Sequence, residues 1–246
     1  MSEVLFSIVM PAFNAESTLY ESVCSVLNQT FTNFELIIVD DCSVDGTRDL
    51  IKQFLNSDDR VRAVFLEVNS GVAVARNSAI NNAVGRYIAF LDADDLWMKD
   101  KLSKQYGAFL NGADVVYSDY VRFYKDNTEK KIISPSVINF NILLNGNCIG
   151  NLTAAYDAKK IGKFYQEPIG HEDYLMWLKI FKVGVTAERI PEVLSRYRVS
   201  STSVSSNKLK AIFWTWSIYR HEINLGFFSS LYHFFRYVVS ALLKRV

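Results

Sequence analysis

The stretch Arg86-Tyr-Ile-Ala-Phe-Leu-Asp-Ala-Asp-Asp-Leu-Trp97 decides the fold, because an apolar run ends there on three carboxylates. Tyr87 to Leu91 is apolar without interruption, which is typical of a strand buried on both faces of a sheet. The three aspartates that follow repel one another unless a cation, hydrogen-bond donors or open water offset their charge. A divalent cation that holds a diphosphate is one such offset, because Mg²⁺ and Mn²⁺ bind carboxylate and phosphate oxygens. The alternative is a solvated acidic turn before the next helix.

Upstream of this stretch, short apolar runs alternate with segments of helical spacing. The expected strands cover 6–10, 34–39 and 61–66, and the expected helices cover 16–29, 47–55 and 72–84. This alternation is typical of right-handed βαβ units, with a parallel sheet and helices on both faces. Ligands bind outside the carboxyl ends of such strands. The polar turns Pro11–Asn14 and Asp40–Asp45 are therefore expected along the same rim as Asp92, Asp94 and Asp95.

The sequence contains neither GxGxxG nor GxxxxGK[ST], so it has no glycine-rich loop of either kind to hold phosphates. A metal ion and a basic side chain would then have to neutralise them. Arg76 is the candidate, because it lies on an otherwise apolar helix that begins beside the rim after Gly71. The alternative is a surface arginine.

Beyond Trp97 the alternation weakens. The expected elements are a helix over 100–110, strands over 113–118, 185–190 and 193–197, a short helix over 157–161 and a long one from 172. Residues 119–139 are expected to be irregular, with 125–131 a solvated charged turn. Residues 141–151, rich in Asn and Gly, are a candidate mobile segment over the site.

A second acidic signal is Gly170-His-Glu-Asp-Tyr174 at the start of a helical stretch. Glu172 and Asp173 could simply stabilise the positive end of the helix dipole. The alternative is catalytic: transfer of a group to a hydroxyl requires a base that accepts the hydroxyl proton. His171 could serve as a base too, and we rank it below Asp173.

The C-terminal region, residues 207–246, is dense in aromatic residues. Apolar side chains recur at helical spacing at Phe228, Leu231, Phe235, Val238 and Leu242, and cations are available at Arg236, Lys244 and Arg245. Such a helix either docks on the preceding domain (residues 1–206) or lies in a membrane interface, and we favour the interface.

Composition excludes several classes of protein. The formal net charge of +1 and the lack of a basic tract give no sign of nucleic-acid binding. Cys24, Cys42 and Cys148 are odd in number and far apart, which indicates neither disulfides nor a zinc site. No signal-peptide pattern and no spanning segment are recognised, so a cytoplasmic protein is expected.

Five motifs in this order resemble the inverting glycosyltransferases of family 2, which have the GT-A fold. They are Ser7-Ile-Val-Met-Pro-Ala-Phe-Asn14, Ile38-Val-Asp-Asp-Cys-Ser-Val-Asp-Gly-Thr47, Gly71-Val-Ala-Val-Ala-Arg-Asn77, Phe90-Leu-Asp-Ala-Asp-Asp95 and Glu172-Asp173. The resemblance covers about residues 5–205. It implies an α/β fold, with a Rossmann-like, mostly parallel central sheet flanked by helices. Residues 1–97 would be the nucleotide-sugar half and 98–206 the acceptor half.

The resemblance also implies a role for each matching residue. Donor-binding residues would be Pro11 and Phe13 beside the base, Asp41 on the base, Arg76 at the uridine or phosphates, Asp92 at the ribose and metal, and also Asn14. Asp94 would ligate Mn²⁺ or Mg²⁺, and Asp173 would be the general base. Acceptor or phosphate contacts are assigned to His171, Glu172 and Arg198. The late family element Tyr-Arg-x-His-x-x-Ser-x-Ser is similar to residues 197–205, but Ser200 replaces its His, so a contact from that His is not carried over.

Members of the family transfer a sugar from a nucleoside diphosphate sugar to a hydroxyl in one step. The resemblance implies a UDP-sugar donor, with UDP-galactose favoured over UDP-glucose and UDP-N-acetylglucosamine, and a saccharide on a polyprenyl diphosphate as acceptor. The product would be a repeat unit of O-antigen, capsule or exopolysaccharide, made by a peripheral protein on the inner face of the cytoplasmic membrane. The rival hypotheses are an inactive nucleotide-sugar-binding or scaffold protein and a metal-dependent nucleotide-sugar hydrolase.

Overall fold

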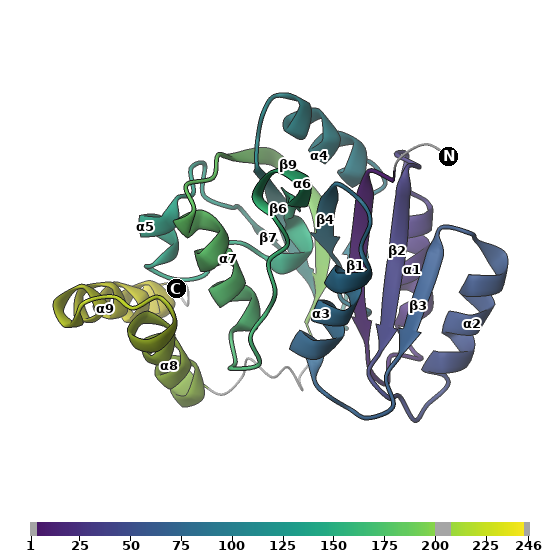
Figure 1. The fold of residues 1–246 in the computed structure, drawn as a ribbon, viewed down its shortest axis with the longest axis horizontal. Coiled ribbons are helices and arrows are strands. Elements are labelled where there is room, and N and C mark those ends of the chain that lie inside the picture. The colour runs from purple at the N-terminus through teal and green to yellow at the C-terminus, as the bar shows by residue number, and fades with distance from the viewer. Residues whose placement is uncertain (1–3, 200–207, 244–246) are drawn as a thin grey trace.

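The computed structural model describes residues 4–199 and 208–243 (Figure 1). Its strands are β1 (Phe6–Ala12), β2 (Phe34–Asp40), β3 (Val61–Phe65), β4 (Tyr87–Phe90), β5 (Leu96–Trp97), β6 (Val115–Phe123), β7 (Glu129–Ile132), β8 (Ala155–Asp157) and β9 (Ala187–Arg198). Its helices are α1 (Leu19–Leu27), α2 (Thr47–Ser57), α3 (Val72–Asn82), α4 (Lys101–Leu110), α5 (Phe140–Leu143), α6 (Ala158–Ile161), α7 (Glu172–Lys182), α8 (Lys208–Ser217) and α9 (Phe227–Leu243). A 3₁₀ turn, η1 (Asn151–Thr153), and a π-helical turn, η3 (Ile218–Glu222), complete the list.

The strands form one mixed sheet in the order β3-β2-β1-β4-β8-β6-β9-β5, with β7 paired to β6. The N-terminal half is parallel as predicted, because β1 pairs in parallel with both β2 and β4. Ala12 lies opposite Asp40, and Val9 lies opposite Phe90. The carboxyl ends of these three strands therefore share one edge of the sheet, which confirms the predicted rim.

Helices cover both faces of this sheet (Figure 1). Successive residues of a strand point to opposite faces, so Ile8 packs in the hydrophobic cluster that includes Val23 of α1, whereas Val9 packs with Ile80 of α3 and Trp177 of α7. All five side chains are buried. Burial of each is worth about 1.5–3 kcal/mol, and it explains why the central strands are apolar without interruption.

The first strand is longer than predicted. Pro11 was expected to end it, but β1 continues to Ala12. The carbonyl of Val9 accepts a hydrogen bond from Leu91 on the β4 side, so Pro11, two residues on, also faces that side. Pairing with β4 has ended by then, so the missing N–H of the proline costs no ladder bond.

The prediction that residues 119–139 are irregular was wrong for 119–123 and 129–132, which are strands, whereas the charged residues 125–131 are exposed as predicted. β6 runs to Phe123 and forms an antiparallel pair with β7, in which Phe123 lies opposite Glu129. β7 has the sequence Glu-Lys-Lys-Ile and its charged residues are exposed. Charge on an exposed strand discourages pairing with other chains. Because the strand has no alternating apolar residues, its hydrophobic pattern did not predict a strand.

The two late strands predicted over 185–190 and 193–197 are one strand, β9. Pro191 interrupts the apolar pattern within it, and the register against β6 shifts at Ser118 and Asp119. Proline is tolerated at such an irregularity because no ladder hydrogen bond is required there. The short antiparallel strands β5 and β8 were not predicted.

The C-terminal helices α8 and α9 lie together at the end of the molecule opposite α2 (Figure 1). One face of α9 packs against α8, where the ring centroids of Phe234 and Trp216 are 5.4 Å apart. Its other face is exposed: Phe228 is 83% and Phe235 68% accessible, and Leu231 is also exposed. The helix therefore both docks and presents an aromatic face. The side chain of Leu242, residues 244–246 and Ser200 lie outside the described residues.

None of the described helices is long and apolar enough to cross a membrane. In the part of the chain that the structure describes, Cys24, Cys42 and Cys148 form no disulfide.

Candidate active site

The first two rim loops are tied together by Asn14. Its backbone N–H donates to Ser43 Oγ (2.9 Å), and its Oδ1 accepts from the N–H of Val44 (2.9 Å). Asn14 has a φ of 47°, a left-handed conformation that asparagine tolerates better than most residues. Beside it Phe13 is half-exposed, whereas Pro11 is buried within β1. The open ring of Phe13 is thus free to contact a planar ligand.

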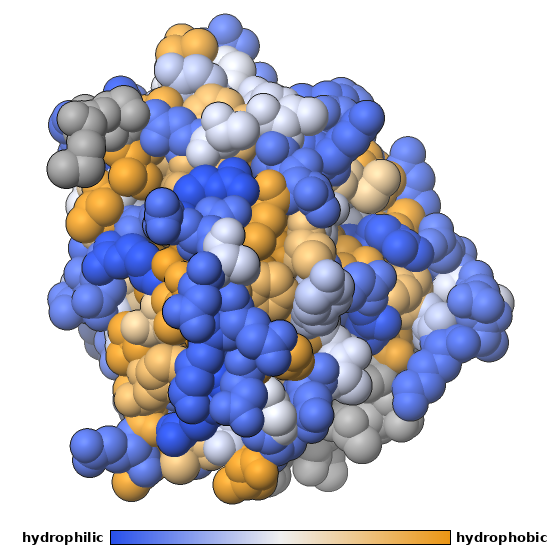
Figure 2. Space-filling model, turned by 90° about the vertical axis from the view of Figure 1, so that its right-hand side faces the viewer, coloured by the Kyte–Doolittle hydropathy of each residue, from blue (hydrophilic) through white to orange (hydrophobic). Residues whose placement is uncertain are grey.

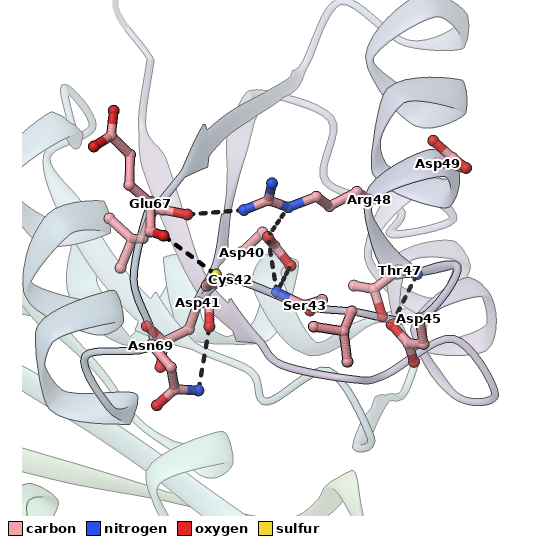
Figure 3. A network of polar contacts seen from close by, with 12 residues as sticks. Asp40, Asp41, Cys42, Ser43, Asp45, Thr47, Arg48, Asp49, Glu67 and Asn69 are labelled. Carbon is pink, nitrogen blue, oxygen red and sulfur yellow. Dashed lines mark hydrogen bonds and ion pairs between the residues drawn. The ribbon is translucent and has the colours of Figure 1, made fainter.

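Asp40 and Asp41 are adjacent but make different contacts (Figure 3). Asp40 is fully buried and pairs with Arg48 at 2.6 Å, so it stabilises the turn. Asp41 accepts hydrogen bonds from the N–H groups of Ser70 (2.7 Å) and Gly71 (2.8 Å). The carboxylate of Asp41 therefore fixes the start of α3, the helix that carries Arg76.

Arg76 is the hub of the site. It is buried, and its Nη2 donates to both carboxylate oxygens of Asp92, at 2.7 and 2.9 Å. Its Nη1 donates to Gln166 Oε1 (3.1 Å) and lies 3.6 Å from Glu172 Oε1. The arginine thus joins α3, the Asp92 turn and the start of α7, and the surface-arginine alternative is wrong.

The three aspartates after β4 differ in environment. Burial, with repulsion from Asp92, raises the pKa of Asp94. Burial raises the pKa of Asp95 well above its usual value, and its carboxylate accepts a hydrogen bond from the N–H of Arg198 (2.8 Å). Asp94 is thus less buried than Asp95 and, unlike Asp92, makes no ion pair with Arg76. Its carboxylate is a candidate cation ligand together with that of Asp92.

Arg198 lies behind this turn. Its Nε donates to the carbonyl oxygen of Asp94 (2.8 Å), and its Nη2 donates to Glu21 (2.7 Å). These contacts hold the acidic turn in shape. They direct the guanidinium to protein groups, so the predicted contact of Arg198 with acceptor or phosphate has no geometric support of its own here.

The third part of the site is the first turn of α7. Asp173 Oδ2 accepts a hydrogen bond from Nδ2 of Asn147 (3.0 Å). Burial raises the pKa of Asp173, although the positive charge of Arg76 opposes the rise. His171 precedes the helix with a φ of 52°, and its ring packs against Trp214 of α8. A carboxylate with a raised pKa in a half-buried position is suited to accept a proton.

The donor set fits a metal that arrives with a diphosphate. Within the described residues, no group of three or more His, Cys, Asp or Glu side chains could enclose a metal ion. Asp92 and Asp94 supply two carboxylates, whose oxygens are hard donors. Mg²⁺ and Mn²⁺ are commonly held by one or two carboxylates, with phosphate oxygens and water completing the coordination.

Several buried polar atoms around the site have no hydrogen-bond partner among the residues described. They are Arg76 Nε, His171 Nε2 and both amide atoms of Asn151. Asn151 lies just before β8, the neighbour of β4, so it belongs to the same end of the sheet as the acidic turn. Buried polar groups are normally paired, so unpaired ones here are available to a polar ligand.

Sequence reasoning missed two residues of this site. Gln166 bonds Arg76, and its backbone is held on both sides by the amide of Asn77 (2.8 Å each). Asn147 bonds Asp173. Both act across long sequence separations, and only the Asn-Gly-Asn run around Asn147 gave any signal.

This fold and site define a glycosyltransferase of the GT-A type. The family model described as Glycosyl transferase family 2 matches residues 7–166, and the chain belongs to that family. It is 40% identical over 98% of both chains to TuaG of Bacillus subtilis (strain 168), which carries a provisional assignment as a teichuronic acid biosynthesis glycosyltransferase. It is 37% identical to WfgD of Escherichia coli, over 99% of this chain and 96% of that one. WfgD is named a UDP-Glc:α-D-GlcNAc-diphosphoundecaprenol β-1,3-glucosyltransferase.

Solved structures share the fold. TarS 1–349 of S. aureus in complex with UDP-GlcNAc has a TM-score of 0.71 at 22% identity, over 95% of this chain and 71% of that one. The mannosyltransferase PcManGT of Pyrobaculum calidifontis in complex with GDP-Man and Mn²⁺ has a TM-score of 0.68 at 18% identity, over 90% and 64%. At these identities the likeness shows the fold alone.

Proposed function

We propose that this glycosyltransferase transfers a hexose from a UDP-sugar to a hydroxyl of a saccharide carried on a polyprenyl diphosphate, with inversion at the anomeric carbon. The observation that carries the proposal is the position of Arg76, which bonds Asp92 on the nucleotide side and lies beside Glu172 at the turn that bears Asp173. One cationic side chain thus joins the predicted donor site to the turn that bears the predicted base.

The donor residues are proposed from the rim loops. Phe13 would stack on the uracil, with Pro11 and Asn14 shaping the edge of that pocket, and Asp41 would lie at the base. Because both Asp41 carboxylate oxygens already accept backbone N–H groups, a uracil N–H would share one of them, which a carboxylate oxygen allows through its second lone pair.

Asp94, with Asp92, would hold the Mn²⁺ or Mg²⁺ ion. When bound, the ion neutralises the charge that develops on the departing diphosphate. Arg76 offers a second positive charge on the same side of the site, which orients the diphosphate without any proton transfer.

Asp173 would take the proton from the acceptor hydroxyl as the hydroxyl oxygen forms its bond to the anomeric carbon. The bond from that carbon to the diphosphate oxygen breaks in the same step, and UDP leaves with the electron pair. His171 and Glu172, on the same turn, would contact the acceptor. Because the oxygen enters opposite the leaving group, the configuration of the sugar inverts.

We propose UDP-glucose as the donor, since WfgD is named for it and is alike over nearly the whole chain. The names of TuaG and WfgD give no support to UDP-galactose, the donor that the family resemblance favoured. The acceptor follows the same argument: a saccharide that begins with N-acetylglucosamine on undecaprenyl diphosphate. Synthesis of a bacterial surface polysaccharide is the process in which such a product is used.

We also propose that residues 207–246 bind the inner face of the cytoplasmic membrane, where a polyprenyl-linked acceptor resides. This segment has six Lys and Arg residues and one acidic residue, a charge of +5, whereas residues 1–206 sum to −4. Exposed Phe228, Leu231 and Phe235 add apolar area on α9. By contrast, the opposite end of the molecule, which bears α2, is mostly hydrophilic (Figure 2). Cations beside an aromatic face suit an anionic lipid surface.

The test is a donor panel. Purified protein is incubated with Mn²⁺, a synthetic N-acetylglucosamine diphospho-lipid and labelled UDP-glucose, UDP-galactose or UDP-N-acetylglucosamine. The proposal predicts a lengthened lipid from UDP-glucose with a β linkage. Transfer from UDP-galactose or UDP-N-acetylglucosamine, without transfer from UDP-glucose, would overturn the assignment of UDP-glucose as the donor. Free sugar without acceptor would indicate a hydrolase, and UDP binding without any product would indicate the inactive binding protein.

A further inference from the structure

The amide of Asn147 has only one orientation that satisfies both of its neighbours. Its Oδ1 accepts from the backbone N–H of Ile149 (3.1 Å), and its Nδ2 points to Asp173 Oδ2 (3.0 Å). A backbone N–H can only donate, so the oxygen must face Ile149 and the NH₂ must face the carboxylate. The hydrogen bond therefore favours the ionised form of Asp173.

Three tyrosines and one histidine contact residues 143–146, which come just before Asn147. Tyr174 donates to the carbonyl oxygen of Leu143 (2.7 Å), and Tyr219 of η3 donates to that of Leu144. The two phenol oxygens also lie 3.1 Å apart, and because each phenol carries one proton, two of these three contacts can be hydrogen bonds at any one time. From α9, His233 Nδ1 lies 3.2 Å from Asn145 Oδ1, and the ring of Tyr237 covers Gly146.

We propose that Asn147 is a positioning residue for Asp173, and that the C-terminal helices hold it in place. Asn147 occupies one carboxylate oxygen and leaves Oδ1 to accept the proton of the acceptor hydroxyl. The catalytic role of Asn147 rests on the proposed function. The hydrogen bond between Asn147 and the Asp173 carboxylate does not depend on that function. The segment 143–147 joins the helices predicted to bind the membrane to the predicted base.

Other charges also act on Asp173 and stay constant in the test. Arg76 faces it from α3, and Arg76 is itself paired with Asp92. Glu172 and His171 lie on its own turn, with opposite effects on the carboxylate. Asn147 is an uncharged donor among these groups, so its replacement changes the hydrogen bond without removing an ion pair.

The test compares Asn147→Ala and Asn147→Asp with Asn141→Asp, an exposed site on α5 just before that segment, which receives the same added charge as Asn147→Asp. Asn147→Asp keeps an acceptor for Ile149 and should fold. The pKa of Asp173 is measured by ¹³C-carboxyl NMR titration of the full chain, assigned with Asp173→Asn. The acid limb of kcat/KM for transfer is measured in parallel.

Loss of a hydrogen bond to a charged group corresponds to a shift of about one to two pH units. We expect both the NMR pKa and the acid limb to move upward by that amount in Asn147→Ala, and by more in Asn147→Asp, which also places a negative charge beside Asp173, with an unchanged KM for the UDP-sugar and no shift in Asn141→Asp. An unmoved NMR pKa, even with lower activity, overturns the proposal. A moved NMR pKa in a protein that transfers no sugar upholds this inference and contradicts the proposed function instead. Asn147→Ala, which has no side-chain donor, carries the comparison alone should Asn147→Asp fail to fold.

Discussion

Arg76 and Asp92 form a two-point contact in which one guanidinium nitrogen reaches both carboxylate oxygens, at 2.7 and 2.9 Å. The arginine is buried, whereas about a third of the Asp92 side chain is accessible to solvent. The pair therefore lies at the boundary between the core and solvent. Burial of a charged arginine is costly unless it is paired, so the core fixes the arginine and the arginine fixes the acidic turn.

We predict that Arg76→Lys lowers kcat/KM for sugar transfer by at least about tenfold. A lysine carries the charge, but its single nitrogen cannot occupy both the Nη1 position beside Gln166 and the Nη2 position beside Asp92. Steady-state kinetics with titration calorimetry of UDP would show the loss. Arg60→Lys is the matched control, because Arg60 pairs with Asp58 away from the rim. Equal activity of wild type and Arg76→Lys would show that the hub is not needed.

Removal of divalent metal should abolish transfer. We expect that excess EDTA stops the reaction, that Mn²⁺ or Mg²⁺ restores it, and that Asp94→Asn raises the Mn²⁺ concentration for half-maximal rate by about tenfold or more, since one of two carboxylate ligands is lost. Asp49→Asn, on the exposed face of α2, is the control. Full activity in EDTA would refute the metal site.

Membrane binding is predicted to depend on the exposed face of α9. Burial of one phenylalanine in an apolar environment is worth about 1.5–3 kcal/mol, so the double change Phe228→Ser and Phe235→Ser should lower partitioning onto anionic vesicles by tenfold or more in a flotation assay. Tyr20→Ser removes an equally exposed aromatic from α1 as a control. If the double variant floats as well as wild type, α9 is not the contact.

Lys101 gives a prediction about stability rather than activity. It is fully buried beneath η1, where its Nζ donates to the carbonyl oxygen of Thr153 (2.9 Å), and burial lowers its pKa well below the usual value. Between that lowered pKa and about 10.4, the unfolded state holds more protons, so stability should rise with pH across this window. Lys101→Met should remove this rise and leave stability at pH 7 equal or higher, because Gln105 still donates to Thr153. Urea unfolding at pH 7 and 9.5 would measure both, and a large loss at pH 7 would contradict the argument.

The parallel half of the sheet and its rim could be predicted because their causes are local. Apolar runs report burial on two faces, and the turns after β1, β2 and β4 follow directly in the sequence. Arg76 could be found for a similar reason, as a lone cation on an apolar helix. Pro11 and Pro191 misled the prediction, since each proline lies where the sheet needs no N–H, and that depends on where a neighbouring strand ends or shifts.

The acceptor half was harder to predict because its order comes from contacts between distant residues. Asn147 and Asp173 are 26 positions apart, and Arg76 and Gln166 are 90 apart. An isolated Asn or Gln has no pattern that marks it as a partner of a catalytic carboxylate. The β6–β7 pair was missed because its exposed charges resemble those of a loop.

The most direct test of the account is transfer by Asp173→Asn, measured beside wild type with UDP-glucose, Mn²⁺ and the lipid-linked acceptor. The substitution keeps the size of the side chain and an acceptor for Asn147, while it removes the base. The account predicts a loss of about 10²–10⁴-fold in transfer rate, with metal-dependent UDP binding unchanged by calorimetry. Transfer at the wild-type rate would contradict the assignment of Asp173 as the base and, with it, the proposed mechanism.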